Sequence, residues 1–288
     1  MKRPVRIITS SLMTGVGPLV VAQPLPVSAL RNADPFLLLH HAGPQTFDPQ
    51  VKAHRIEPHP HRGFEPVTFV FKGSVLHRDS LGNEGQIGAG EVQWITSGSG
   101  IVHSEGPTPE VQESGGELEL IQLWVNLPAN KKMITPTYQE LHHGDIPRIH
   151  ALDGALTLDV VAGEYGGVSG PATTHSPLMT AMGHFTKGAV GTIAAPQYEQ
   201  VLLYVLNGSL RINGEHVVDR HHLAAFDIAG DTIDIETLSD GSLLLLAGEP
   251  LREPIAMHGP FVMNTDDELR TAFRDFAGGK MGTLVDNE

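Results

Sequence analysis

Two short triplets in this sequence carry side chains that commonly bind metal ions. They are HPH at residues 59–61 and HSE at residues 103–105. Alternate residues of a β-strand project from the same face, so each triplet can direct two ligand atoms at one ion. Facing each other, His59, His61, His103 and Glu105 would supply three imidazole nitrogens and one carboxylate oxygen. That set suits a divalent transition metal and leaves octahedral positions free for chemistry.

Chance is the competing explanation for such pairs, because the chain has 16 histidines among 288 residues. The flanking glycines and strand-like patterns favour the metal-binding interpretation of both triplets. The adjacent pair His221 and His222 is different, since neighbouring residues of a strand point to opposite faces. We expect that pair to be solvated, and we expect no second metal site.

Composition and charge restrict the class of protein. The chain has no cysteine, which excludes thiolate metal sites and cysteine nucleophiles and is compatible with a reducing compartment such as the cytoplasm. Its net charge of -14 argues against direct binding to nucleic acid, which requires a positive surface. The apolar stretch at residues 12–22 is interrupted by Gly15, Gly17 and Pro18, so it predicts a strand and turn. No apolar run is long enough for a transmembrane helix.

The secondary structure that must position the triplets is predicted to be almost entirely β. Glycine and proline contribute 32 and 21 residues, and they separate short apolar runs. Strands are expected at residues 67–71, 91–96, 118–127, 156–162, 201–206 and 242–247. This pattern is typical of an all-β barrel or sandwich. One helix is expected near the end, where residues 264–268 offer a cap and an acidic first turn and Gly278 stops the helix.

The sequence also indicates a coarse internal duplication. VTFVFKGS at residues 67–74 and VLLYVLNGS at residues 201–209 are both apolar strands that end in a Gly-Ser turn. We therefore expect two barrels, an N-terminal one at residues 1–135 with the metal site and a C-terminal one at residues 136–288 without it. Where the first barrel has His59 and His61, the second has Gln197 and Glu199.

Longer stretches of the chain resemble the pirin family, a two-barrel branch of the cupin superfamily. The resemblance is carried by DPFLLLHH at residues 34–41, PHPHRGFEPVTFVFKGSVLHRDSLG at 58–82, GEVQWITSGSGIVHSE at 90–105 and IQLWVNLP at 121–128. It continues with YQEL at 138–141 and LLLAGEPLREPIAMHGPFVMNT at 244–265. The resemblance implies two cupin-type jelly-roll barrels and a short C-terminal helix.

The resemblance implies the same four ligands, His59, His61, His103 and Glu105. Most other cupins take their carboxylate from the position four residues after the second histidine, which is Glu65 here. Glu65 has the same strand parity as His59 and His61, so geometry alone does not remove it. We favour Glu105, because Gly63 is expected to break the strand before Glu65.

Several neighbours of the triplets have simpler structural interpretations. Arg62 is expected to form an ion pair with Glu65 or Glu57, and guidance of an anionic substrate is the alternative. The aromatic side chains of the strands, namely Phe69, Phe71, Trp94 and Trp124, are expected in the core. For Gln122 the sequence leaves two alternatives open, a side chain that points into the barrel cavity and a satisfied core amide.

The resemblance implies an activity like that of quercetin 2,3-dioxygenases, which open the heterocyclic ring of a flavonol with loss of carbon monoxide. Flavonol and dioxygen would then be the substrates, Glu105 a base, and Fe(II) the first choice of metal, with Mn, Ni, Cu, Zn and Co as alternatives. The rival interpretation is a redox-sensing regulator that acts on a protein partner, as proposed for pirin co-regulators. A metal-free barrel used only for assembly is a third interpretation.

Overall fold

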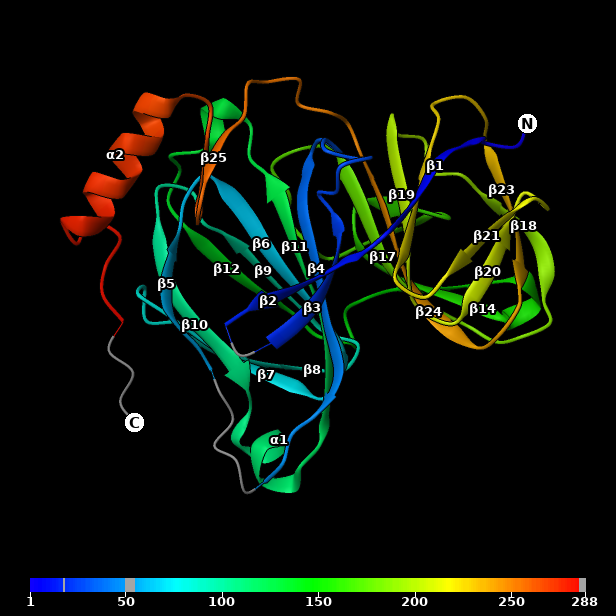
Figure 1. Ribbon diagram of the computed structural model, residues 1–288, viewed down its shortest axis with the longest axis horizontal. Coiled ribbons are helices and arrows are strands. Elements are labelled where there is room, and N and C mark those ends of the chain that lie inside the picture. The colour runs from blue at the N-terminus through cyan, green and yellow to red at the C-terminus, as the bar shows by residue number, and fades with distance from the viewer. Residues whose placement is uncertain (18, 50–54, 285–288) are drawn as a thin grey trace. The chain divides into compact units, whose positions relative to one another are not determined.

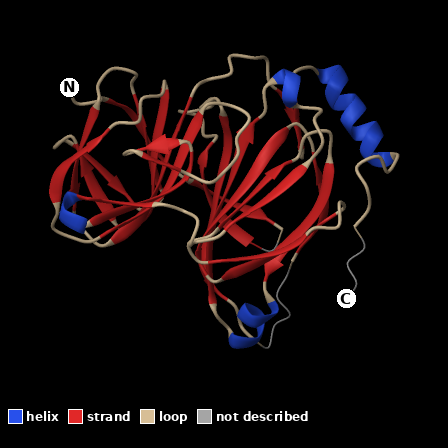
Figure 2. Cartoon of the chain, turned by 180° about the vertical axis from the view of Figure 1, so that it is seen from behind, coloured by secondary structure: helices blue, strands red, loops and turns tan. Residues whose placement is uncertain are grey.

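The computed structural model describes residues 1–17, 19–49 and 55–284 of the chain, and its regular structure is mostly strand (Figures 1 and 2). The chain divides into two compact units. The N-terminal barrel unit comprises residues 14–21, 36–142 and 251–288. The C-terminal barrel unit comprises residues 1–13, 22–35 and 143–250. The all-β class and the two-barrel architecture predicted from the sequence are confirmed.

The compact units run across the predicted division into residues 1–135 and 136–288. Residues 1–13 group with the C-terminal barrel, and residues 251–288 group with the N-terminal barrel. The division after residue 135 therefore remains a proposal about how the chain is organised. The exchange of end segments depends on contacts between residues far apart in the sequence, and local patterns do not encode these.

The N-terminal barrel consists of a large and a small antiparallel sheet. In spatial order, the strands of the large sheet are β12 (Thr137–Leu141), β9 (Val92–Thr96), β6 (Phe64–Lys72), β11 (Glu117–Asn126), β4 (Phe36–Thr46), β3 (Leu19–Leu25) and β2 (Leu12–Val16). Those of the small sheet, also in spatial order, are β5 (Ile56–His61), β10 (Ile101–Pro107), β7 (Ser74–Asp79) and β8 (Glu84–Gly88). Both predicted ligand triplets lie in the small sheet.

The C-terminal barrel has the same division into two sheets. Its large sheet is formed by β1 (Val5–Ser10), β22 (His222–Phe226), β19 (Gln200–Asn207), β24 (Gly241–Gly248), β17 (Leu178–Phe185), β14 (Leu156–Ala162) and β13 (Arg148–Ala151). Its small sheet is formed by β18 (Val190–Ala194), β23 (Thr232–Thr237), β20 (Ser209–Ile212) and β21 (His216–Asp219). The hairpin of β15 (Glu164–Tyr165) and β16 (Val168–Ser169) and the 3-10 turn η2 (Leu152–Gly154) complete this unit.

The two similar segments, residues 67–74 and 201–209, occupy equivalent positions in the two barrels. In each, an apolar strand of the large sheet passes through a glycine into a strand of the small sheet. Gly73 joins β6 to β7 and Gly208 joins β19 to β20, with φ of 75° and 82°. A positive φ is easily reached by glycine and strained for other residues, which explains the shared Gly-Ser turn.

The interiors of the two barrels differ in polarity. The C-terminal barrel is filled by apolar side chains such as Val201, Leu203, Ala224 and Leu245. Within the described residues, every cluster of three or more potential metal ligands belongs to the N-terminal barrel. The apolar side chains of the C-terminal barrel form a close-packed core.

The segment after residue 250 returns to the N-terminal barrel, where it forms the hairpin of β25 (Ala256–His258) and β26 (Phe261–Met263) and then helix α2 (Asp266–Ala277) (Figure 1). Thr265 and Glu268 form a capping box at the start of α2, and Gly278 caps its end, as the sequence predicts. Two shorter elements, α1 (Pro109–Ser114) and the 3-10 turn η1 (Ala129–Lys131), were not predicted. Among the described helices, none combines the length and the apolar character needed to span a membrane.

Candidate metal centre in the N-terminal barrel

The two predicted ligand triplets lie on neighbouring strands. Strands β5 and β10 pair antiparallel, with His103 directly opposite His59 and Ile101 opposite His61. Gly63, at φ 85°, separates β5 from β6, and a Cβ there would lie 2.0 Å from the carbonyl oxygen of Val262. The expected strand break after His61 is therefore present.

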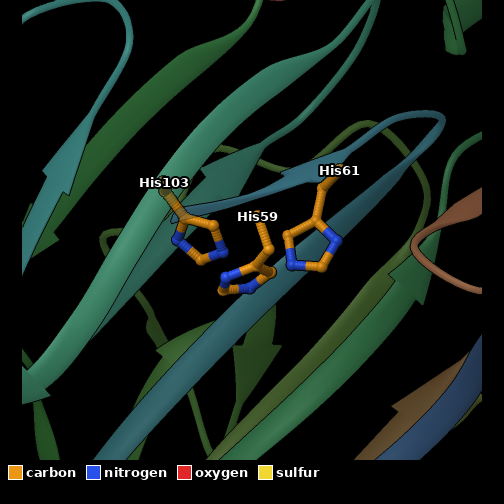
Figure 3. Close-up of side chains that lie close together, drawn as sticks. All are labelled: His59, His61 and His103. Atoms are coloured by element: carbon orange, nitrogen blue, oxygen red, sulfur yellow. The ribbon is translucent and has the colours of Figure 1, made fainter. Parts of the chain in front are cut away.

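Three imidazoles converge from these strands (Figure 3). The ring centroids of His59 and His103 are 4.3 Å apart, and each lies 4.8 Å from the centroid of His61. One ring nitrogen from each residue lies within 4.8 Å of the other two. Nitrogens this close can contact a single cation.

Hydrogen bonds orient two of the three rings. Nδ1 of His59 donates to the carbonyl oxygen of Glu57 at 2.8 Å, and Nδ1 of His61 donates to that of Pro260 at 3.4 Å. Because Nδ1 carries the hydrogen, Nε2 of each ring is left with a lone pair. This arrangement is usual for histidines that bind metal ions.

Unpaired buried nitrogens mark the point where the rings meet. Nε2 of His61 and both nitrogens of His103 are buried and have no hydrogen-bond partner in the described part of the chain. Leaving such groups unpaired is costly, so a ligand is expected there. Neutral imidazole nitrogens are good donors to a divalent transition metal, and the site fits one.

Burial keeps the imidazoles of His61 and His103 neutral. The pKa values of His61 and His103 both lie well below the ordinary histidine value. Burial is the larger cause, and electrostatic repulsion from the nearby His59 ring is the second. An imidazole must be deprotonated at the coordinating nitrogen to bind a metal. At neutral pH these rings are therefore in the metal-binding form.

Glu105, the fourth predicted ligand, lies beside the three imidazoles in a second cluster with His77 and His103. Its Oε1 is 3.6 Å from Nδ1 of His103 and 3.9 Å from Nδ1 of His77. Two amides donate to this carboxylate: Gln93 to Oε1, and Gln122 to Oε2 at 3.2 Å. Of the two alternatives left open for Gln122, the structure selects the side chain that faces the cavity, and its amide is also bonded.

His77 and Asp79 are functional candidates that the sequence reasoning missed. They lie on β7, opposite Glu105 and His103 of β10, and Nε2 of His77 is 3.2 Å from Oδ2 of Asp79. Burial lowers the pKa of His77, but the carboxylates of Asp79 and Glu105 outweigh burial and raise it. Their sequence, HRD at residues 77–79, has the same spacing of two as the other triplets and could have revealed them.

Glu65, the alternative carboxylate, lies away from the histidines. It belongs to neither cluster of potential ligands in the described chain, and it accepts a hydrogen bond from Thr96 at 2.8 Å. Burial raises the pKa of Glu65 to about 7, against the opposing effect of the hydrogen bond from Thr96. Along β6 the side chain alternates with Phe64, whose ring contacts that of His61 at 5.0 Å, so Glu65 points to the opposite face.

The prediction that Arg62 pairs with Glu65 or Glu57 was wrong. Its guanidinium pairs with Asp275 of α2 at 2.9 Å and donates to the carbonyl oxygen of Ser99, and neither Glu57 nor Glu65 takes part in this ion pair. Asp275 is 213 residues further along the chain, so no local pattern could indicate it. This ion pair ties the returning C-terminal segment to the strand that carries His59 and His61.

Aromatic side chains pack around the site. Phe69, Phe71 and Trp94 are buried core residues, as expected. Trp124 is only half-buried, and its ring lies 5.4 Å from that of His61 and 4.2 Å from that of Phe64. Trp124 is therefore also part of the surroundings of the metal centre.

A cavity of about 50 Å³ opens beside Glu105. Its walls are mainly apolar, with Glu105, Gln122 and His40 as the residues that bring polar groups to it. Burial lowers the pKa of His40 to about 4, so this ring is neutral at physiological pH. Glu105 thus lines the cavity and also contacts His103.

Comparison with known proteins assigns this architecture to a family. The family model Pirin matches residues 19–125, and the model of the Pirin C-terminal cupin domain matches residues 182–282. A protein of Pseudomonas aeruginosa named "putative quercetin 2,3-dioxygenase" is 43% identical over 250 residues, which cover 87% of each chain. Pirin of Homo sapiens is 37% identical, covering 88% of this chain and 84% of its own.

Solved structures show the same similarity. The crystal structure of a quercetin 2,3-dioxygenase from Acinetobacter baumannii superposes with a TM-score of 0.93 at 38% identity, covering 99% of this chain and 100% of its own. The chain belongs to the pirin family, and its two barrels are cupin domains.

Proposed function

We propose that this protein is a metal-dependent dioxygenase that acts on a flavonol such as quercetin or on a related enol or polyphenol. The observation that carries the proposal is the convergence of three imidazoles, two of them with unpaired buried nitrogens, next to Glu105, which lines a cavity. The similarity to a quercetin 2,3-dioxygenase over 99% of the chain supports this reaction class. The substrates would be the flavonol and dioxygen.

In this proposal His59, His61 and His103 hold the metal and Glu105 is the fourth ligand. Fe(II) is our first choice, with Mn, Ni, Cu, Zn and Co as alternatives that this donor set also accepts. A bound divalent metal would act as a Lewis acid that lowers the pKa of the substrate hydroxyl. Three histidines and one carboxylate leave positions for substrate and dioxygen.

The residues of the chain provide orientation, a base and exclusion of water. Backbone carbonyl groups fix the ring orientations of His59 and His61. Glu105 faces the cavity, where its carboxylate can accept the proton of a substrate hydroxyl group. The apolar walls, which include Leu19, Val21 and Leu120, limit the entry of water.

The size of the cavity restricts how a flavonol would bind. Pockets that enclose drug-sized ligands usually measure about 300–1,000 Å³. A cavity of about 50 Å³ encloses much less, so we expect only the reacting edge of the flavonol to enter it. The remaining rings would then lie at the mouth of the cavity.

A spectroscopic assay tests the proposal. The protein is loaded with Fe(II) and incubated aerobically with quercetin, and loss of the flavonol absorbance is followed. We expect turnover in the wild type and in His150→Ala, which replaces an exposed histidine of the C-terminal barrel, and none in His61→Ala. If no divalent metal supports turnover by the wild type, the dioxygenase proposal is wrong.

The regulatory role remains the second candidate, because the similarity to Pirin of Homo sapiens covers 88% of the chain. In that case the metal would control contact with a protein partner. A stable partner recovered by pull-down with the metal-loaded wild type, but not with His61→Ala, together with absence of turnover, would favour this role. We propose the cytoplasm as the location in either case.

A further inference from the structure

Three polar residues that the proposed reaction does not use surround the carboxylate of Glu105, two as hydrogen-bond donors and one as an ion-pair partner. These are His77, Gln93 and Gln122, which we call the Glu105 cradle. Gln93 donates to Oε1, Gln122 donates to Oε2 at 3.2 Å, and Nδ1 of His77 lies 3.9 Å from Oε1. All three side chains come from strands that line the interior of the N-terminal barrel.

Further contacts fix His77 in place. Its ring stacks on that of Tyr138, with centroids 4.6 Å apart and planes 9° apart. Nε2 of His77 faces Oδ2 of Asp79, whose carboxylate also accepts from the backbone nitrogen of Leu81 at 2.9 Å and from the side-chain amide of Asn83 at 2.8 Å. The contacts with Tyr138 and Asp79 therefore fix the orientation of the His77 ring, and its Nδ1 faces Glu105.

Gln93 is fixed in a similar way. It is completely buried, and its amide also contacts the hydroxyl of Thr68 at 3.4 Å and that of Tyr138 at 3.5 Å. A buried amide bonded on several sides keeps one orientation, so its donor stays directed at Glu105. The cradle is thus a preorganised binding site for a carboxylate.

Glu105 lies between the cradle and the three-histidine site. Its carboxylate contacts His103, but it is not among the atoms that lie within 4.8 Å of both His59 and His61. His103 and Glu105 project from the same face of β10, so the Glu105 side chain can reach either the cradle or the three-histidine site. The carboxylate therefore has two sets of partners, the cradle and the three-histidine site.

We propose that the cradle makes Glu105 an exchangeable ligand. His77, Gln93 and Gln122 act as positioning residues that compete with the metal for the carboxylate and keep Glu105 available to the cavity as a base. This inference rests on the proposed metal site. It predicts that weakening the cradle strengthens the bond between Glu105 and the metal.

A double-mutant cycle with Co(II) tests the inference without turnover. Co(II) is titrated into the full chain, and its visible absorption reports both affinity and the number of ligands. We expect His77→Leu to tighten Co(II) binding by about tenfold and to change the spectrum. Substituting a residue that contacts a metal ligand usually weakens binding by about this factor or more, so the cradle predicts the opposite sign. In the Glu105→Gln background the same substitution should change neither quantity, because the carboxylate is gone.

Two further variants keep the test decisive. His77→Gln retains a side chain that can donate to Glu105 and should bind Co(II) like the wild type. Gln122→Leu, at a half-buried position, should reproduce the effect of His77→Leu if that variant does not fold. The inference is overturned if these cradle substitutions leave Co(II) affinity unchanged, if the effect persists in Glu105→Gln, or if the wild type binds a second Co(II) at His77.

Activity separates this inference from the proposed function. If the wild type oxidises quercetin, His77→Leu should lower kcat with little change in KM, because the base is withdrawn while the cavity is intact. Turnover without coupling in the cycle would contradict the cradle and leave the dioxygenase in place. Coupling without turnover would support the cradle and refute the dioxygenase.

Discussion

Replacing Glu65 with glutamine is expected to change how the stability of the fold depends on pH. The Glu65 carboxyl group is completely buried, and burial raises its pKa from 4.5 to about 7. The folded chain therefore binds this proton more tightly than the unfolded chain does. As pH rises from about 4.5 to about 7, the unfolded state loses its proton first, and the free energy of unfolding falls.

The size of the effect follows from the same values. One pKa unit corresponds to about 1.4 kcal/mol, so a change from 4.5 to about 7 amounts to about 3 kcal/mol at most. Glutamine cannot ionise at this position. We therefore expect Glu65→Gln to match the wild type near pH 4 and to be more stable than it at pH 8, by up to about 3 kcal/mol.

Urea unfolding at a series of pH values measures this difference. Other groups titrate in the same range, but they are common to both proteins and cancel in the comparison. Glu113→Gln, at an exposed position of α1, is the matched control and should show no such trend. A difference between Glu65→Gln and the wild type that is constant with pH, or that grows toward low pH, would refute the reasoning.

Three substitutions test how the C-terminal segment and its helix are held. Lys132→Met should destabilise the fold by about 3 kcal/mol in urea unfolding, because the buried ammonium donates to several acceptors that include the carbonyl oxygen of Val262, and an unchanged midpoint would contradict this. Arg62→Met removes the pair with Asp275 and should cost about 2 kcal/mol and speed hydrogen exchange in α2; normal protection of α2 would count against it. Thr265→Ala removes the helix cap and should cost about 1 kcal/mol by thermal unfolding, whereas Thr265→Ser should cost much less.

Each of the six strands predicted from the sequence overlaps a strand of the structure, and both predicted ligand triplets lie on strands, β5 and β10. Residues 156–162 form a strand with the predicted bounds, and α2 begins at the predicted cap, because alternation and capping act over a few residues. His59, His61 and His103 could be selected since strand parity and antiparallel pairing suffice to bring them together.

Features that depend on distant contacts could not be predicted. The partner of Arg62 lies in α2, and the C-terminal segment belongs to the N-terminal barrel unit, both of which require the tertiary fold. The surroundings of Glu105 were missed for a related reason. Its amide partners come from β9 and β11, and only the register between strands places Gln93 and Gln122 at one carboxylate.

Metal content is the most direct test of the three-histidine site. The wild type, His61→Ala and the control His150→Ala are dialysed against a divalent transition metal, and bound metal is determined by elemental analysis. We expect about one ion per chain in the wild type and in His150→Ala and almost none in His61→Ala, because a ligand with a buried unpaired nitrogen has been removed. Equal metal content in all three proteins, or none in the wild type, would contradict the account.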